Sequence, residues 1–262
     1  MTAAILVALT ALTPPVAPTD LDEAQRLFYN GRYDAAEELT SALCTDELER
    51  LAACELRSST LLFQIKRVLS GQRDKNKALK QCSRCAGWIA AFKAVTLSAQ
   101  RVARARLEMA PQDHDVRFLL GKVDLNYVWL QLGVLGHKTG WSEYWEARRS
   151  LDAVLKQDPD NVRARVARAW IDYIVDTQMA RGTRWVLGGG NKKRGLATVR
   201  DAAALDADPF VRAEAGFALW DMQVREGETA LAVESARALA RDFPDNEELQ
   251  KFLAASAAHV SQ

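Results

Sequence analysis

Apolar residues recur at intervals of three and four along most of the chain, which is the spacing of one face of an α-helix. Proline and glycine interrupt this pattern, and no stretch alternates apolar and polar residues in the way that a strand would. The pattern therefore predicts an all-α protein. We expect a series of antiparallel helical hairpins, each of which buries its apolar face against the next.

Four segments end in a similar acidic turn, which contains Pro111, Pro159 or Pro244 and in the fourth case Ala207. A small residue lies twelve positions before each turn and an apolar residue lies eight positions before it. In chain order these residues are Ala99, Ala147, Gly195 and Ala232, and then Ala103, Leu151, Val199 and Ala236. Small residues let two helix backbones approach closely, proline ends a helix, and the Asp or Asn that follows can cap the next one. Each turn is therefore expected to close one hairpin and open the next.

Three segments resemble the tetratricopeptide repeat (TPR) family. Residues 30–43 look like its inter-helix turn and second helix, with Gly31, Tyr33 and Ala36 in the family's positions. Residues 143–161 and 225–246 look like second helices followed by the terminal proline turn. The chain is also similar to exported bacterial proteins of this family.

The resemblance implies an α-solenoid, with residues 20–258 as one TPR-like domain and residues 246–258 as its capping helix. Successive turns are 48, 48 and 37 residues apart, whereas the family's repeat has about 34 residues. We therefore expect longer hairpins in two units and an irregular superhelix.

The N-terminus differs from the rest of the chain. An apolar run extends from Ala3 to Leu12 and is followed by Pro14, Pro15 and Pro18. Such a run has the length of a signal-peptide core and is too short to span a bilayer. We interpret residues 1–19 as a signal peptide, which predicts a periplasmic or secreted protein with no stable membrane span in its mature chain. Because no basic residue precedes the run, an apolar helix packed on the core of a cytoplasmic protein is the alternative.

Composition and motifs argue against several classes of function. The 35 basic and 34 acidic side chains leave a net charge of +1, so nucleic acid is not an expected partner. His114, His137 and His259 are far apart in sequence, and neither a zinc-protease motif nor a nucleophile elbow is present. We therefore expect a protein that is not an enzyme and that has no cofactor or catalytic metal. The oligomeric state does not follow from the sequence.

The four cysteines are Cys44, Cys54, Cys82 and Cys85. An even number fits disulfide bonds in an exported protein. Cys44 ends one expected helix and Cys54 lies early in the next, so a local bond could join them. Cys82 and Cys85 are three residues apart near a helix start, which also allows a bond. The alternatives are a zinc site and a thiol oxidoreductase that uses the CxxC pair. The second alternative lacks the strand that a thioredoxin-type motif follows.

Two other stretches carry unusual residues. Residues 185–195, WVLGGGNKKRG, are interpreted as a hairpin turn, with an anion site at a helix start as the alternative. Residues 127–145 contain five large rings, at Tyr127, Trp129, Trp141, Tyr144 and Trp145. Rings at helical spacing most often fill an interior, and a ligand pocket is the alternative.

In the TPR family the first helices of the hairpins line a concave surface that takes peptides or partner helices. The family's positions correspond here to Phe118, Lys122 and Asn126 on one first helix, and to Arg163, Val166, Trp170 and Tyr173 on the next. The resemblance thus implies a non-enzymatic scaffold that binds a protein or peptide partner. Two alternatives are a small-ligand-binding accessory protein similar to the T-components of TRAP transporters, with residues 127–145 as its pocket, and the thiol oxidoreductase.

Overall fold

The computed structural model describes residues 19–44, 50–137 and 139–260, without the side chains of residues 259 and 260. Every regular element within these ranges is a helix, so the all-α prediction is confirmed. The helices are α1 (Asp20–Tyr29), α2 (Tyr33–Leu43), α3 (Leu51–Leu69), α4 (Lys75–Gln81), α5 (Cys85–Met109), α6 (His114–Val128), the π-helical η2 (Trp129–Val134), α7 (Trp141–Gln157), α8 (Val162–Gln178), α9 (Arg181–Val186), α10 (Lys192–Ala203), α11 (Pro209–Glu226), α12 (Thr229–Asp242) and α13 (Glu247–Val260). The signal peptide expected at residues 1–19 lies outside the described residues, except for Thr19, which caps α1.

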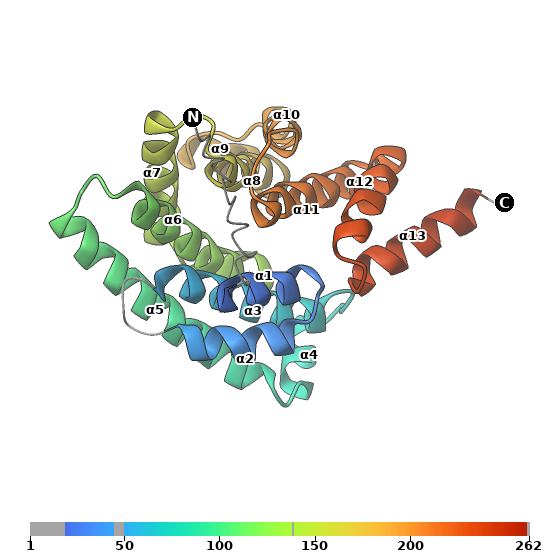
Figure 1. The fold of residues 1–262 in the computed structure, drawn as a ribbon, viewed down its shortest axis with the longest axis horizontal. Helices are drawn as coiled ribbons and strands as arrows, with labels where there is room; N and C mark the ends of the chain where they lie inside the picture. The colour runs from blue at the N-terminus through green and yellow to red at the C-terminus, as the bar shows by residue number, and fades with distance from the viewer. Residues whose placement is uncertain (1–18, 45–49, 138, 261–262) are drawn as a thin grey trace, which may run out of the picture.

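The helices form a stack of hairpins that curves through the molecule (Figure 1). The hairpins pair α1 with α2, α3 with α5, α6 with α7, α8 with α10, and α11 with α12. First helices also contact one another, because α3 packs on α1 and α6, and α11 packs on α8. The first helices α1, α3, α6, α8 and α11 therefore make the inner wall of the curve, and the second helices lie outside it.

The acidic turns link consecutive hairpins as expected. The helix that follows each turn begins at an Asp or Asn whose side chain accepts a hydrogen bond from a first-turn amide, and these capping residues are Asp113, Asn161, Asp208 and Asn246. The small residues before the turns are buried at helix crossings. Ala147 is fully buried, and a Cβ on Gly195 would lie only 2.8 Å from the carbonyl oxygen of Ala169. The crossing of α8 and α10 therefore needs a residue without a side chain.

The two longer repeats hold their extra residues within the hairpins. One insertion consists of η2 and the loop to α7, and the other consists of α9 and the loop to α10. In the second loop Gly188 and Gly189 both have φ near +76°, a conformation that residues with a side chain rarely adopt. The glycine-rich stretch is thus a hairpin turn, as predicted from the sequence.

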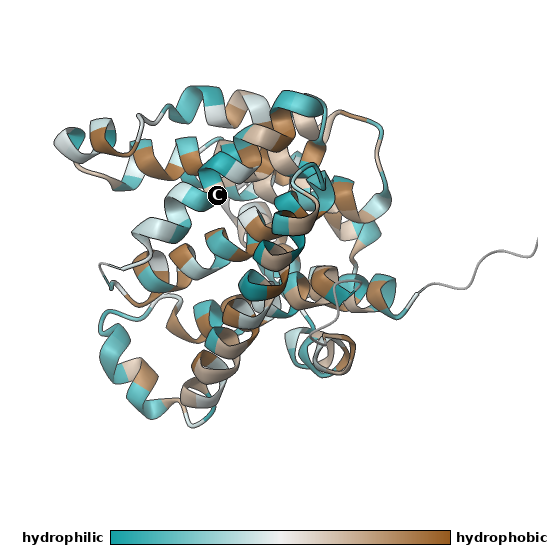
Figure 2. Cartoon of the chain, turned by 90° about the vertical axis from the view of Figure 1, so that its left-hand side faces the viewer, coloured by the Kyte–Doolittle hydropathy of each residue, from teal (hydrophilic) through white to brown (hydrophobic). Residues whose placement is uncertain are grey.

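The apolar core follows the stack and is not gathered at one centre. Figure 2 shows the hydrophobic faces of the helices turned toward their neighbours and the hydrophilic faces turned outward. One cluster joins α3, α5 and α6, the next joins α6, α7 and α8, and a third joins α8, α10 and α11. Leu119 and Trp129 pack against both of the first two clusters, so the core is continuous from hairpin to hairpin.

The first and last units of the stack touch each other. The ring of Tyr29 at the end of α1 lies 5.5 Å from that of Phe217 and 5.4 Å from that of Phe243. Asn246 Nδ2 donates a hydrogen bond to the carbonyl of Tyr29 at 2.7 Å, and the amide of Asp245 donates one to Asn30 Oδ1 at 3.1 Å. The chain therefore closes on itself, and α1 packs against α11 as well as α2.

Candidate functional site

Charged side chains from four first helices meet on the inner wall. Glu214 of α11 accepts hydrogen bonds from Lys122 Nζ of α6 at 2.5 Å and from Arg163 Nε of α8 at 2.6 Å. Arg163 also reaches Glu55 of α3 at 3.3 Å, and its guanidinium carbon lies 4.7 Å from the ring centroid of Phe118. Two bases and two acids balance one another, so this charged cluster joins α3, α6, α8 and α11.

The pKa values in the charged cluster reflect burial and pairing. Burial alone would raise the pKa of Glu214, but the positive charges of Arg163 and Lys122 and their hydrogen bonds hold it at about 2. Burial opposes the charge of Arg163, yet the nearby Glu214 and Glu55 outweigh it and raise the pKa of Arg163. Both groups therefore stay charged over the whole physiological pH range, and the cluster is a fixed feature of the wall.

An aromatic cluster is formed by residues of η2, α8 and α11. The ring of Trp170 on α8 packs edge-on against Trp129, with centroids 5.4 Å apart, and against Tyr173 at 5.7 Å. The guanidinium carbon of Arg225 on α11 lies 5.7 Å from the Trp170 ring. Trp170 itself is half-buried. The wall therefore combines a charged cluster with an aromatic cluster, and both bridge α8 and α11.

The structure places the seven residues of the expected groove on α6 and α8, the two helices on which the sequence placed them. Their exposure differs. The side chains of Lys122 and Arg163 are 18% and 26% exposed, and Trp170 is half-buried. The other four, Phe118, Asn126, Val166 and Tyr173, are between 2% and 8% exposed. A partner on this wall would therefore meet the first three, while the remaining four pack within the chain.

The four buried members contribute to packing between helices. Asn126 Nδ2 donates hydrogen bonds to Ser58 Oγ at 2.8 Å and Ser59 Oγ at 2.9 Å, which joins α6 to α3. Tyr173 Oη donates a hydrogen bond to Glu226 at 2.8 Å. Sequence reasoning missed Glu55 and Glu214, because helical spacing shows which face turns inward but not which acid meets which base.

Two cavities lie within the described chain, and no residue of the aromatic stretch 127–145 lines either of them. The larger cavity, of about 270 Å³, lies between α7, α8 and α10 and is lined by charged residues such as Arg168, Asp172 and Arg194. The other, of about 250 Å³, lies beside the start of α1. Tyr144 is buried, and Trp129 and Trp145 are partly buried in the core. These three rings fill the interior, which favours the packing interpretation over the ligand pocket, whereas Trp141 is 42% exposed.

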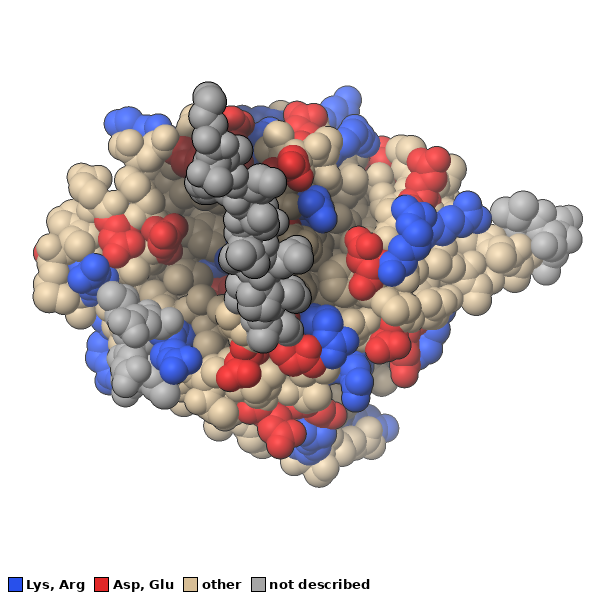
Figure 3. All heavy atoms as spheres, in the orientation of Figure 1, with Lys and Arg blue, Asp and Glu red and all other residues tan. Residues whose placement is uncertain are grey.

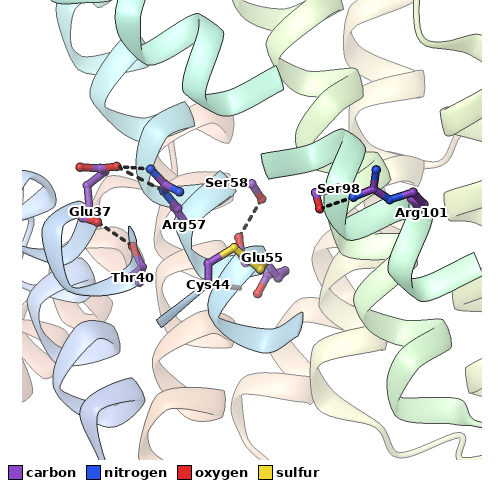
Figure 4. Close-up of a disulfide and its surroundings, with 9 residues drawn as sticks. Glu37, Thr40, Cys44, Glu55, Arg57, Ser58, Ser98 and Arg101 are labelled. Atoms are coloured by element: carbon purple, nitrogen blue, oxygen red, sulfur yellow. Dashed lines mark hydrogen bonds and ion pairs between the residues drawn. A yellow bond between two sulfur atoms is a disulfide. The ribbon is translucent and has the colours of Figure 1, made fainter. Parts of the chain in front are cut away.

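Two disulfides connect neighbouring helix ends. Cys44 at the end of α2 is bonded to Cys54 near the start of α3, with the Glu37–Arg57 ion pair beside the bond (Figure 4). Cys82 is bonded to Cys85 between α4 and α5. Both are the local pairs that the spacing allowed. With all four sulfurs in disulfides, no thiolate is left for the zinc site considered above.

Charges of both signs are mixed over the face seen in Figure 3. No group of three or more potential metal ligands occurs in residues 19–44, 50–137 and 139–260. Over the same ranges, no helix is both long and apolar enough to cross a membrane.

The architecture defines a class, the curved stacks of antiparallel helix pairs. Comparison with solved structures finds a similar fold. The crystal structure of a thermophilic TPR protein from Thermus thermophilus superposes on this chain with a TM-score of 0.50. The match covers 91% of this chain and 97% of that one at 15% sequence identity. No protein-family model and no curated protein matches the sequence. The protein has a TPR-like fold, as its turns and second helices predicted.

Proposed function

We propose that the protein is a non-enzymatic scaffold that binds a protein or peptide partner on the inner wall of its stack. The observation that carries the proposal is the half-buried Trp170, which contacts Trp129 and Arg225 and is not fully buried in the core. Tryptophan and arginine are the residue types that contribute most to binding energy at interfaces. Lys122 and Arg163, both partly exposed, add polar contacts along the same wall.

The proposed partner is a peptide with both apolar and polar anchors. Its apolar side chain would pack on Trp170, and its polar groups would hydrogen-bond near Arg163. Since Arg163 already pairs with Glu214 and Glu55, the wall has no uncompensated charge to select a strongly charged partner. Specificity would then come mainly from shape and from the aromatic anchor.

Site-specific photo-crosslinking in the native host tests this proposal. A photoreactive phenylalanine at position 170 should crosslink to a discrete partner, whereas the same group at Leu97, which is 61% exposed on α5, should not. Trp170→Ala should weaken binding of the identified partner at least about tenfold, as loss of an aromatic anchor does. Equal crosslinking at both positions, or undiminished binding by the variant at unchanged helical content, would contradict the proposal.

We further propose that the protein works in the periplasm or outside the cell. Two disulfides fit an oxidising compartment. Protein recovered from the native host, alkylated before digestion, should yield linked peptides for both pairs. Free thiols at all four positions would contradict this location. The small-ligand and thiol-oxidoreductase alternatives have no comparable observation in their favour.

A further inference from the structure

The hairpin insertion between α8 and α10 exposes apolar residues at its outer side. Trp185 is 82% exposed and Val186 is 59% exposed, both on the short helix α9. Arg184 of the same helix points toward α8, where it pairs with Asp176 and donates a hydrogen bond to the carbonyl of Met179 at 2.9 Å. A short helix that turns its arginine inward and exposes its tryptophan and valine reverses the usual arrangement of a protein surface.

The loop that follows α9 is anchored to α7 by hydrogen bonds. Tyr144 Oη and Arg148 Nη1 of α7 both donate hydrogen bonds to the carbonyl of Leu187, at 2.8 and 2.7 Å, and Arg148 Nη2 donates one to the carbonyl of Gly188 at 3.0 Å. Leu187 is buried. Trp185 and Val186 are therefore presented outward by an anchored segment.

The charge around these two residues is positive. Residues 177–200 contain six Lys and Arg and no Asp or Glu, in a chain whose net charge is only +1. Arg181 and Lys193 are exposed, and neither has an ion-pair partner within the described chain. Arg181 lies one turn before Trp185 on α9, and Lys193 lies in the first turn of α10. The exposed tryptophan and valine thus share this basic segment with two bases that are available to an outside anion. The other four bases are paired with acids elsewhere in the chain, and they are Arg184, Lys192, Arg194 and Arg200.

We propose that this α9 surface, made of Arg181, Trp185, Val186 and Lys193, docks on an anionic lipid bilayer. Tryptophan beside a small apolar residue favours the boundary between headgroups and acyl chains, and basic residues near it gain from the negative surface potential. The surface is at the tip of a hairpin and lines neither of the two cavities described above. An acidic peptide would bind best in a groove. The flat layer of phosphates on a bilayer therefore fits this surface better. The docking surface shares no residue with the proposed partner-binding wall, so it goes beyond the scaffold function.

Sedimentation of the purified full chain with lipid vesicles tests the proposal. The protein should bind vesicles made of equal parts phosphatidylglycerol and phosphatidylcholine, and should not bind pure phosphatidylcholine vesicles. The double variant Arg181→Glu, Lys193→Glu should reduce the partition coefficient at least about tenfold, because each base near the surface contributes to attraction. Trp185→Ala should reduce it several-fold and should remove the fluorescence quenching caused by lipids brominated on their acyl chains.

Matched controls separate docking from folding and from simple charge attraction. Met109→Ala, at a residue that is 75% exposed on α5, should bind like the wild type. Because Trp185 and the two bases are exposed, the variants should keep the wild-type circular dichroism spectrum and melting temperature. No binding to the anionic vesicles at low salt, or equal binding by Trp185→Ala and wild type, would overturn the proposal. Tight binding to polyglutamate without binding to the anionic vesicles would also overturn the proposal.

Discussion

Asn246 donates a hydrogen bond to the backbone carbonyl of Tyr29 at 2.7 Å, although 217 residues separate the two in sequence. The same side chain accepts hydrogen bonds from the amides of Glu248 and Leu249 through Oδ1, at 3.0 and 3.1 Å. One buried amide group therefore caps the last helix and fastens the first helix to it.

Asn246→Ala should remove the cap and leave the Tyr29 carbonyl without this donor, which should lower the free energy of unfolding by about 2–3 kcal/mol. Asn191→Ala is the matched control, because Asn191 caps α10 through the amide of Arg194 without joining distant segments. Asn191→Ala should lower the free energy of unfolding by about 1 kcal/mol. Urea unfolding gives both values, and hydrogen exchange should rise in α1 only for Asn246→Ala. Equal losses in the two variants, with α1 still protected, would contradict the closure.

Glu214→Gln should destabilise the protein by about 3 kcal/mol, because it leaves Lys122 without its carboxylate partner and leaves Arg163 with Glu55 alone. Glu247→Gln, which removes the exposed pair with Lys251, should change stability little. The low pKa of Glu214, about 2 against an ordinary 4.5, stabilises the fold above pH 4.5, and this contribution is lost as the pH falls through 2. The difference between wild type and Glu214→Gln should therefore shrink in strong acid. A difference that stays constant there, in melts followed by circular dichroism, would contradict the assignment.

Asp124 on α6 should make stability fall as the pH rises from mildly acidic to alkaline. Burial, and then the negative charge of Glu146, raise its pKa from 3.8 to about 8. Below 3.8 the folded and unfolded states both carry the proton, whereas between 3.8 and 8 only the folded state keeps it, so the stability it supplies is lost over that range. Asp124→Asn stays neutral and retains the acceptor for Gln100, which donates to Oδ1 at 2.7 Å. Its melting temperature should exceed that of wild type by a margin that grows toward pH 8.

Asp115→Asn, at an exposed carboxylate on the same helix, is the control for that series. Its melting temperature should run parallel to that of wild type, because its side chain faces solvent and its replacement leaves the buried Asp124 unchanged. If Asp124→Asn also runs parallel to wild type, Asp124 does not hold its proton in the folded state.

Gly195→Ala should destabilise the protein by about 1–3 kcal/mol, since the added methyl group would lie 2.8 Å from the carbonyl oxygen of Ala169 and force α10 away from α8. Gly87→Ala gives the opposite expectation, because that glycine is helical with no atom within 4 Å of the added carbon. Gly87→Ala should raise the free energy of unfolding by up to about 1 kcal/mol, because alanine favours a helix more than glycine does. Thermal melts of the two variants check the pair. If both variants change the melting temperature in the same direction, the close crossing at Gly195 does not restrict the side chain at that position.

Elements that depend on short spacings could be predicted from the amino-acid order alone. The turn residues and their Asp or Asn caps, the buried Gly195 and Ala147, and the bond between Cys44 and Cys54 all follow from which residues lie within a turn or a hairpin of each other. The resemblance to the TPR family placed Arg163 and Trp170 on one first helix, and both lie on α8. These predictions held because local hydrogen bonding and side-chain direction establish them before any long-range packing.

The way in which the hairpins meet depends on the assembled stack. Arg163 pairs with Glu214, which lies 51 residues further along, and the curvature of the stack brings Asn246 to Tyr29. In the assembled stack Tyr173 is buried while Trp170 stays partly uncovered. The curvature is the sum of small rotations set by side-chain packing at every interface between hairpins. No single segment of sequence encodes that sum, so the partners on the inner wall are known only once the whole chain has packed.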